Sequence, residues 1–76
     1  MPMDRSEEPA ARERLLNAAV ALFARKGYHA TSVREIVAAA GVTKPVLYYW
    51  LRNKEGVFRE LLQLAVAAHD AVLADV

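Results

Sequence analysis

The chain lacks the residues on which several classes of small protein depend. It has no cysteine, which excludes a disulfide framework and a thiolate zinc site. Its two histidines, His29 and His69, lie far apart in sequence, and its glycines form no phosphate-binding loop. No set of residues therefore stands out as a catalytic, metal or cofactor site, and we do not expect an enzyme.

Segments typical of export or membrane insertion are also missing from the sequence. Residues 1–8 are charged and contain no apolar core, so they do not resemble a signal peptide. No apolar run is long enough for an unbroken membrane span, and we expect no membrane partner. Residues 1–8 are expected to form a flexible, solvated arm, in which Arg5 could touch a phosphate.

What the sequence contains favours a packed helical domain with unevenly distributed charge. Apolar residues make up 55% and charged residues 25% of the 76 residues, which is too apolar for a disordered chain. The net charge is only +1, but between residues 31 and 54 four bases accompany the single acid Glu35. These bases are Arg34, Lys44, Arg52 and Lys54. A positive middle is typical of a local surface that faces phosphates.

Residues 9–26 are predicted to form the first helix. Pro9 suits a first helical turn, and Lys26 followed by Gly27 is typical of a helix end. Apolar residues recur at helical spacing along one face of this segment. They are Leu15, Ala18, Ala19, Leu22 and Phe23. We expect this helix to contribute to the core and to carry no chemistry.

A second helix is predicted to begin at Thr31 or Ser32. The run from Ser32 to Glu35 matches a capping box, in which hydroxyl and carboxylate satisfy backbone N–H groups reciprocally. Thr31 is an alternative cap. The expected buried face consists of Val33, Ile36, Val37 and Ala40. Because a helix N-terminus with free N–H groups also binds anions, Thr31 or Ser32 can contact a phosphate in addition to capping.

The stretch that begins at Gly41 is predicted to be the turn between the second helix and a third. Gly41 ends the second helix, because a residue without Cβ enters the left-handed region at little cost. Thr43 is a candidate N-cap for a third helix over residues 43–51, and Pro45 fits its first turn. Thr43 must cap through the Val46 N–H, because proline has none. Two helices joined by such a turn predict a helix-turn-helix.

The third helix should present polar and aromatic residues outward. Leu47, Trp50 and Leu51 share one face, which should pack on the first two helices. The outward residues are Lys44, Pro45, Tyr48 and Tyr49. Lysine can bind guanine or a phosphate, tyrosine hydroxyls can donate to phosphates, and Pro45 and Val46 can contact a thymine methyl. These features predict that the helix enters the major groove of DNA. The alternative is that the tyrosines are half-buried packing residues.

Residues 54–76 are predicted to form a fourth helix with Asn53 as its N-cap. Lys54 in the first turn opposes the helix dipole unless a phosphate lies against it, which supports Lys54 as a DNA contact. From Ala65 onward the helix is apolar almost all round, so it should have partners on several sides. We expect that the chain stops within a larger design; the alternatives are a truncated chain or a small self-associating protein. A second possible function is a helical protein–protein interaction module that docks through this helix.

Three runs of residues resemble the tetracycline-repressor (TetR) family of bacterial transcriptional regulators. They are Thr31-Ser-Val-Arg-Glu-Ile36, Ala40-Gly-Val-Thr-Lys-Pro-Val-Leu-Tyr-Tyr49 and Asn53-Lys-Glu55. The likeness covers about residues 12–62. It implies an all-α fold in which residues 9–53 form a three-helix, homeodomain-like helix-turn-helix domain. Residues 54–76 would then be a connecting helix toward a missing C-terminal domain.

The resemblance also implies a set of DNA contacts. Phosphate contacts are implied for Thr31 or Ser32, Tyr48, Tyr49 and Lys54, and base-edge contacts for Arg34, Lys44, Pro45 and Val46. With the cap residue Thr43, these are the candidate DNA-binding residues. Trp50 departs from the family, which usually has histidine or tyrosine there, and Leu51 replaces a usual phenylalanine. The Trp50 departure puts a polar contact at that position in question.

The function implied by the resemblance is that of a ligand-responsive repressor. Such a protein binds a palindromic operator in double-stranded DNA as a homodimer, with the two third helices about 34 Å apart. The resemblance assigns dimerisation and a small-molecule inducer to the missing domain only. It also implies a cytoplasmic, nucleoid-associated location in a bacterium and no cofactor.

Overall fold

The computed structural model describes residues 8–74, with side chains up to residue 68, and this part of the chain is all-α. Its helices are α1 (Pro9–Lys26), α2 (Val33–Ala40), α3 (Lys44–Leu51) and α4 (Lys54–Ala74). These bounds confirm the predicted fold class and agree closely with the predicted helices. Residues 1–7 of the expected arm, including Arg5, lie outside the described residues. Residues 75–76, the last two of the predicted fourth helix, also lie outside them.

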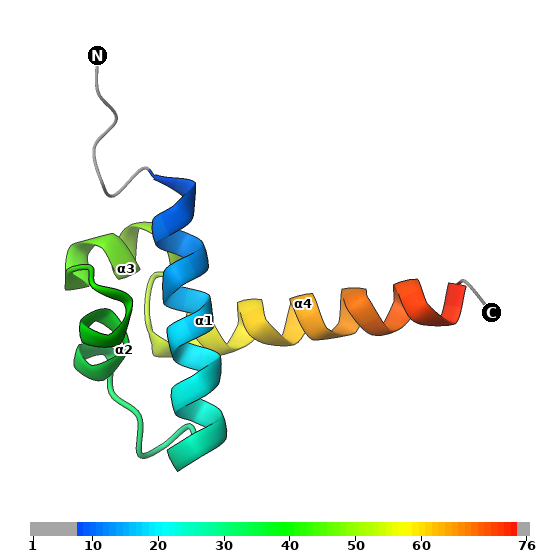
Figure 1. Cartoon of the computed structure of the whole chain (residues 1–76), viewed down its shortest axis with the longest axis horizontal. Coiled ribbons are helices and arrows are strands. Elements are labelled where there is room, and N and C mark those ends of the chain that lie inside the picture. The colour runs from blue at the N-terminus through cyan, green and yellow to red at the C-terminus, as the bar shows by residue number, and fades with distance from the viewer. Residues whose placement is uncertain (1–7, 75–76) are drawn as a thin grey trace.

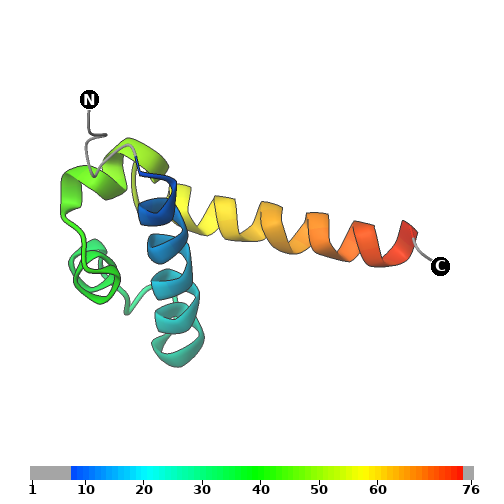
Figure 2. The ribbon, with the colours of Figure 1, turned by 45° about the horizontal axis from the view of Figure 1, so that its top comes forward.

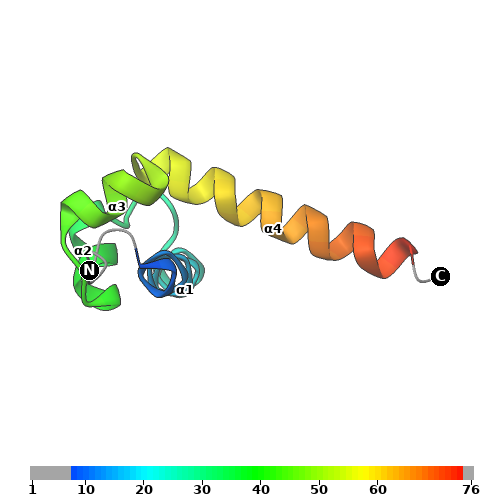
Figure 3. The ribbon, with the colours of Figure 1, turned by 90° about the horizontal axis from the view of Figure 1, so that it is seen from above.

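Helices α1, α2 and α3 form a body from which α4 projects (Figure 1). In Figures 1 and 2, α2 and α3 lie on one side of α1, and α4 leaves on the other side. Seen from above, α4 continues well past the end of the three-helix body (Figure 3). The body is therefore a compact support for α3, whereas the C-terminal part of α4 extends away from it (Figure 3).

The helix ends follow from the residues at their caps. Gly27 (φ 86°) follows α1, and Gly41 (φ 71°, left-handed) follows α2. The Gly41 N–H donates to the Ala38 carbonyl at 3.2 Å, and the Val42 N–H donates to the Val37 carbonyl at 3.0 Å. These bonds satisfy carbonyls that the end of α2 would otherwise leave unpaired. The turn predicted at Gly41 is confirmed.

The core draws on all four helices. Leu15, Ile36, Leu47 and Val57 are fully buried, one from each helix. The buried hydrophobic residues are Ala11, Leu15, Leu16, Ala19, Leu22, Ile36, Val37, Ala40, Val46, Leu47, Leu51 and Val57. The apolar faces predicted for α1 and α2 are confirmed, although Ala11 and Leu16 extend the α1 face beyond the prediction.

The start of α4 is attached to α1 and to the loop that follows α1. Phe58 lies 5.1 Å from Tyr28 and 6.1 Å from Phe23, measured between ring centroids. Arg12 of α1 forms an ion pair with Glu60 of α4. These contacts fix the direction in which α4 leaves the body, and they place Lys54 against the loop between α1 and α2.

The junction between α3 and α4 is a tight turn. Arg52 has a positive φ of 72° with ψ −53°, and the Asn53 N–H donates to the Leu51 carbonyl at 2.9 Å. This is the geometry of a strained γ-turn. The Asn53 side chain accepts a hydrogen bond from the Gly56 N–H at 2.7 Å, which confirms the predicted cap of α4.

Beyond the body, α4 exposes apolar side chains. Val57 is buried and Leu61 is partly buried, but Phe58, Leu62, Leu64 and Val66 are exposed. The prediction that the body leaves much of this helix uncovered is confirmed up to residue 68, beyond which no side chain is described. Within residues 8–74, no helix combines the length and hydropathy that crossing a bilayer requires.

Candidate nucleic-acid interface

The outer face of α3 carries two tyrosines beside a lysine. Tyr48 is 50% exposed and Tyr49 is 56% exposed, and Lys44 and Pro45 at the start of the helix are also exposed. On the opposite face, Leu47 is fully buried. The division of α3 into an inner and an outer face is therefore as predicted. Tyr48 and Tyr49 thus face solvent on a helix whose opposite face packs into the core through Leu47.

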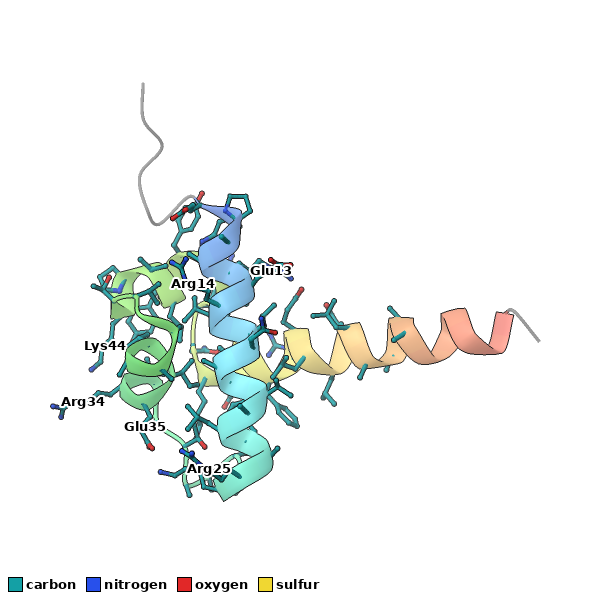
Figure 4. All side chains as sticks on the ribbon, in the orientation of Figure 1. Glu13, Arg14, Arg25, Arg34, Glu35 and Lys44 are labelled. Atoms are coloured by element: carbon teal, nitrogen blue, oxygen red, sulfur yellow. The ribbon has the colours of Figure 1, made fainter. Side chains whose placement is uncertain are left out.

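The N-terminus of α2 adds polar groups on the same side of the molecule. Figure 4 shows Arg34 and Lys44 extending away from α1, whereas Glu13 lies on the other side of that helix. Ser32 and Arg34 are exposed, and among the described side chains neither Arg34 nor Lys44 takes part in an ion pair. We call the set Ser32, Arg34, Lys44, Pro45, Tyr48 and Tyr49 the outward surface. Its uncompensated cations suit a polyanion.

The cap of α2 is built by a reciprocal pair of hydrogen bonds. The Glu35 N–H donates to Ser32 Oγ at 3.1 Å, and the Ser32 N–H donates to Glu35 Oε1 at 3.2 Å. Ser32 is thus the cap in preference to Thr31, as the capping box predicts. The pKa of the exposed Glu35 carboxyl lies below its ordinary value, because Lys26 and then the Ser32 N–H donate hydrogen bonds to it.

Two predicted DNA-binding side chains are turned inward. Thr31 is 1% exposed, and its hydroxyl donates to the Gly27 carbonyl at 2.8 Å, so the side chain has no free surface for a phosphate. Val46 is 7% exposed and belongs to the hydrophobic core, so its methyl groups are not free to meet a base. In the structure Thr31 thus stabilises the loop after α1 and Val46 packs α3 onto the body, and the proposed interface is built without these two side chains.

Thr43 precedes α3 in the expected extended conformation, but its hydroxyl makes no capping hydrogen bond. Its backbone carbonyl accepts instead from the N–H groups of Val46 at 3.1 Å and Leu47 at 3.4 Å. The predicted side-chain cap at Thr43 is therefore wrong. Thr43 is exposed and directly precedes Lys44 of the outward surface, and it remains a predicted DNA contact.

Lys54 is partly buried against the loop between α1 and α2. Its Nζ donates to the carbonyl oxygens of Tyr28 at 2.9 Å and Thr31 at 3.1 Å. It also lies 4.2 Å from the centroid of the Tyr28 ring. Sequence reasoning gave no sign of these contacts, because they join α4 to a loop more than twenty residues earlier.

Trp50 packs partly against the core, as its spacing from Leu47 predicts. Its indole N–H is buried without a hydrogen-bond partner among the described residues. The ring stands edge-on to Tyr49, with centroids 5.1 Å apart. Trp50 thus supports the outward tyrosine from the side. Within the described part of the chain, no three His, Asp or Glu side chains gather as a metal site requires.

Comparison with known proteins identifies relatives of the domain. Residues 15–61 match the family model described as bacterial regulatory proteins, tetR family. The HTH-type transcriptional regulator YdgC of Bacillus subtilis (strain 168) is 45% identical over 51 residues, which are 67% of this chain and 26% of YdgC. The HTH-type transcriptional repressor ComR of Escherichia coli (strain K12) is 41% identical over 66 residues, covering 82% of this chain and 31% of ComR.

An activator is also among the relatives. The HTH-type transcriptional activator FasR of Mycolicibacterium smegmatis is 44% identical over 52 residues, covering 68% of this chain and 24% of FasR. The chain thus spans about a quarter to a third of the length of these curated relatives. No solved structure gave a significant match.

Proposed function

Because this chain belongs to the tetR family of bacterial regulatory proteins, we propose that its outward surface binds a specific sequence in double-stranded DNA. The family consists of helix-turn-helix DNA-binding regulators and not of enzymes, and the chain is such a regulator. The observation that carries the proposal is the outer face of α3. Tyr48 and Tyr49 are about half exposed there beside Lys44, which forms no ion pair with any side chain described in the structure.

In the proposed complex, α3 lies in the major groove with its N-terminal turn toward the bases. There Lys44 would donate to guanine O6 and N7, and Pro45 would contact a thymine methyl. Tyr48 and Tyr49 donate from their hydroxyls to phosphate oxygens on the rim of the groove. Leu47 stays in the core, so the body holds the helix at a fixed angle to the DNA.

The N-terminus of α2 supplies the second part of the proposed interface. Ser32 lies where the helix dipole favours an anion, and its position suits a phosphate contact. Arg34 extends from the first turn and is proposed to reach a base edge or a neighbouring phosphate. Contacts from α2 and α3 together would fix the register of the domain along the duplex.

For the whole protein we propose a ligand-responsive repressor that binds a palindromic operator as a homodimer. The likeness to the repressor ComR supports repression, whereas FasR is named as an activator. In the dimer, two copies of α3 would enter successive major grooves about 34 Å apart. The exposed apolar residues of α4 are suited to packing against further parts of such a protein.

The exposed side chains Phe58, Leu62, Leu64 and Val66 favour one other candidate function, a helical module that docks a partner protein. Salt dependence separates the two functions. If the chain binds DNA, its cationic side chains release counterions from the phosphates, and added salt opposes that release. Affinity of the full chain for a labelled mixed-sequence duplex should therefore fall steeply between about 50 and about 200 mM salt. Absence of any DNA binding at low salt would favour the docking module.

A further inference from the structure

We propose that Lys54 is a positioning residue, which holds the N-terminus of α2 in place for DNA and does not itself bind a phosphate. The inference rests on the proposed function, because it concerns Ser32 and Arg34 of the outward surface. It gives α4 a direct part in the shape of the interface, through the first residue of that helix.

The Lys54 ammonium group makes three contacts with the loop between α1 and α2. Two backbone carbonyls, of Tyr28 and Thr31, accept from Nζ at 2.9 and 3.1 Å. The Tyr28 ring provides a third contact through its π face, 4.2 Å away. An ammonium group has three N–H donors. Carbonyls therefore use two of the three donors and the Tyr28 ring covers the cation, which leaves at most one donor for a phosphate.

The Thr31 carbonyl belongs to the peptide group that opens the α2 cap. The N–H of the same peptide group is that of Ser32, and it donates to Glu35 Oε1 at 3.2 Å. Lys54 and Glu35 thus hold one peptide group from its two ends, a cation at the oxygen and a carboxylate at the hydrogen. The two bonds polarise the amide in the same direction, so each strengthens the other.

The network around this peptide group extends to α1. Glu35 pairs with Lys26 in the last turn of α1. Thr31 is fixed by two further bonds, from its hydroxyl to the Gly27 carbonyl at 2.8 Å and from its N–H to the Tyr28 carbonyl at 3.2 Å. Lys54 connects α4 to this network, so the orientation of the α2 N-terminus relative to α4 depends on it.

Removal of the ammonium should loosen the cap peptide while the core keeps its packing. Ser32 and Arg34 would then sample more positions, and DNA binding would cost more conformational entropy. No ion pair with DNA would be lost. The affinity should therefore fall by a similar factor at every salt concentration.

The test uses the full chain with Lys54→Met, which keeps the apolar stem and removes the charge. The probe is a labelled duplex that the wild-type chain enriches from a random pool. We expect binding weaker by about fivefold to tenfold, with an unchanged slope of log affinity against log salt. A slope flattened by about 0.9 would make Lys54 a phosphate ligand and overturn the proposal. Arg34→Met is the matched control and should flatten the slope.

Amide hydrogen exchange supplies a second readout. Exchange at Thr31 and Ser32 should speed up in Lys54→Met, while the amide of the buried residue Leu47, which donates to the Thr43 carbonyl, stays protected. Equal acceleration throughout the chain would mean a general loss of stability and would also overturn the proposal. If Lys54→Met does not fold, Lys54→Gln takes its place, because an amide still donates but carries no charge. A wild-type chain that enriches no duplex would count against the proposed function, and the exchange data would still decide the role of Lys54.

Discussion

Gly56 packs directly against the Leu51 carbonyl, so closely that a Cβ on residue 56 would lie 1.8 Å from that oxygen. Gly56→Ala should therefore lower the free energy of unfolding by about 1–3 kcal/mol, because backbone must move to admit the methyl group. Helix propensity alone predicts the opposite sign, a gain of about 1 kcal/mol. Urea unfolding followed by circular dichroism distinguishes the two, and a stabilised variant would contradict the close contact.

Arg52 carries the backbone strain of the same junction. Its φ of 72° is unfavourable for a residue with a Cβ, so Arg52→Gly should stabilise the fold by about 1 kcal/mol. Arg52→Ala removes the side chain but keeps the Cβ, and it should leave stability nearly unchanged. The comparison requires only thermal unfolding of the three proteins. Equal stability of the glycine and alanine variants would show that residue 52 is not strained.

The sequence predicted the helix ends of this fold but not the geometry of the junction between α3 and α4. Caps and turns at Gly27, Ser32 and Gly41 depend on neighbours within a few residues, and the helix bounds followed from them. The contact of Gly56 with Leu51 depends on the angle at which two helices meet. No local pattern encodes that angle, so Gly56 could be interpreted only as a cost in helix propensity.

The ion pair of Glu35 predicts a dependence of stability on pH. Hydrogen bonds from Lys26 and from the Ser32 N–H lower the pKa of Glu35 below the ordinary value of 4.5. The native state therefore holds a proton on this group more weakly than the unfolded state. The resulting stabilisation is present above pH 4.5 and is lost as the pH falls through the lower, folded pKa.

Glu35→Gln checks this dependence. The difference in melting temperature between the wild-type chain and the variant should be largest near neutral pH and should shrink below about pH 4.5. Lys26→Met should shrink the same difference at neutral pH, because it removes the main cause of the lowered pKa. A difference that grows on acidification would mean that folding raises the pKa of Glu35.

Lys44 is predicted to read bases. In a selection from random duplexes, Lys44→Ala should relax the preference at one or two positions of the bound site, with a cost of about 1–3 kcal/mol for the preferred base. Positions contacted by other residues should keep their preferences. If affinity falls equally for all sequences, Lys44 contacts the backbone of the DNA and not a base.

The candidate site was partly predictable for a similar physical reason. Tyr48 and Tyr49 could be placed outside because Leu47 and Leu51 set the inner face by helical spacing alone. Thr31 looked like an anion contact because it sits beside a helix start, but its hydroxyl turns back to Gly27. Such an interaction depends on the path of the loop, which the spacing of residues does not fix.

The surroundings of Lys54 and Val46 likewise could not be predicted from neighbouring residues. A lysine in a first helical turn suggests an external anion, yet backbone carbonyls from a distant loop supply the negative charge here. Val46 borders the exposed start of α3, but its side chain turns into the core. Both outcomes arise from packing between elements that are separate in sequence.

The central claim, that the outer face of α3 reads DNA, is tested most directly by one selection experiment. Random duplexes are enriched with three proteins: the wild-type chain, a variant with Lys44, Tyr48 and Tyr49 changed to alanine, and Leu62→Gln as a control on α4. We predict that the wild-type chain and the Leu62 variant enrich the same sequence motif and that the triple variant enriches none. The same motif from the triple variant, or none from the wild-type chain, would contradict the account.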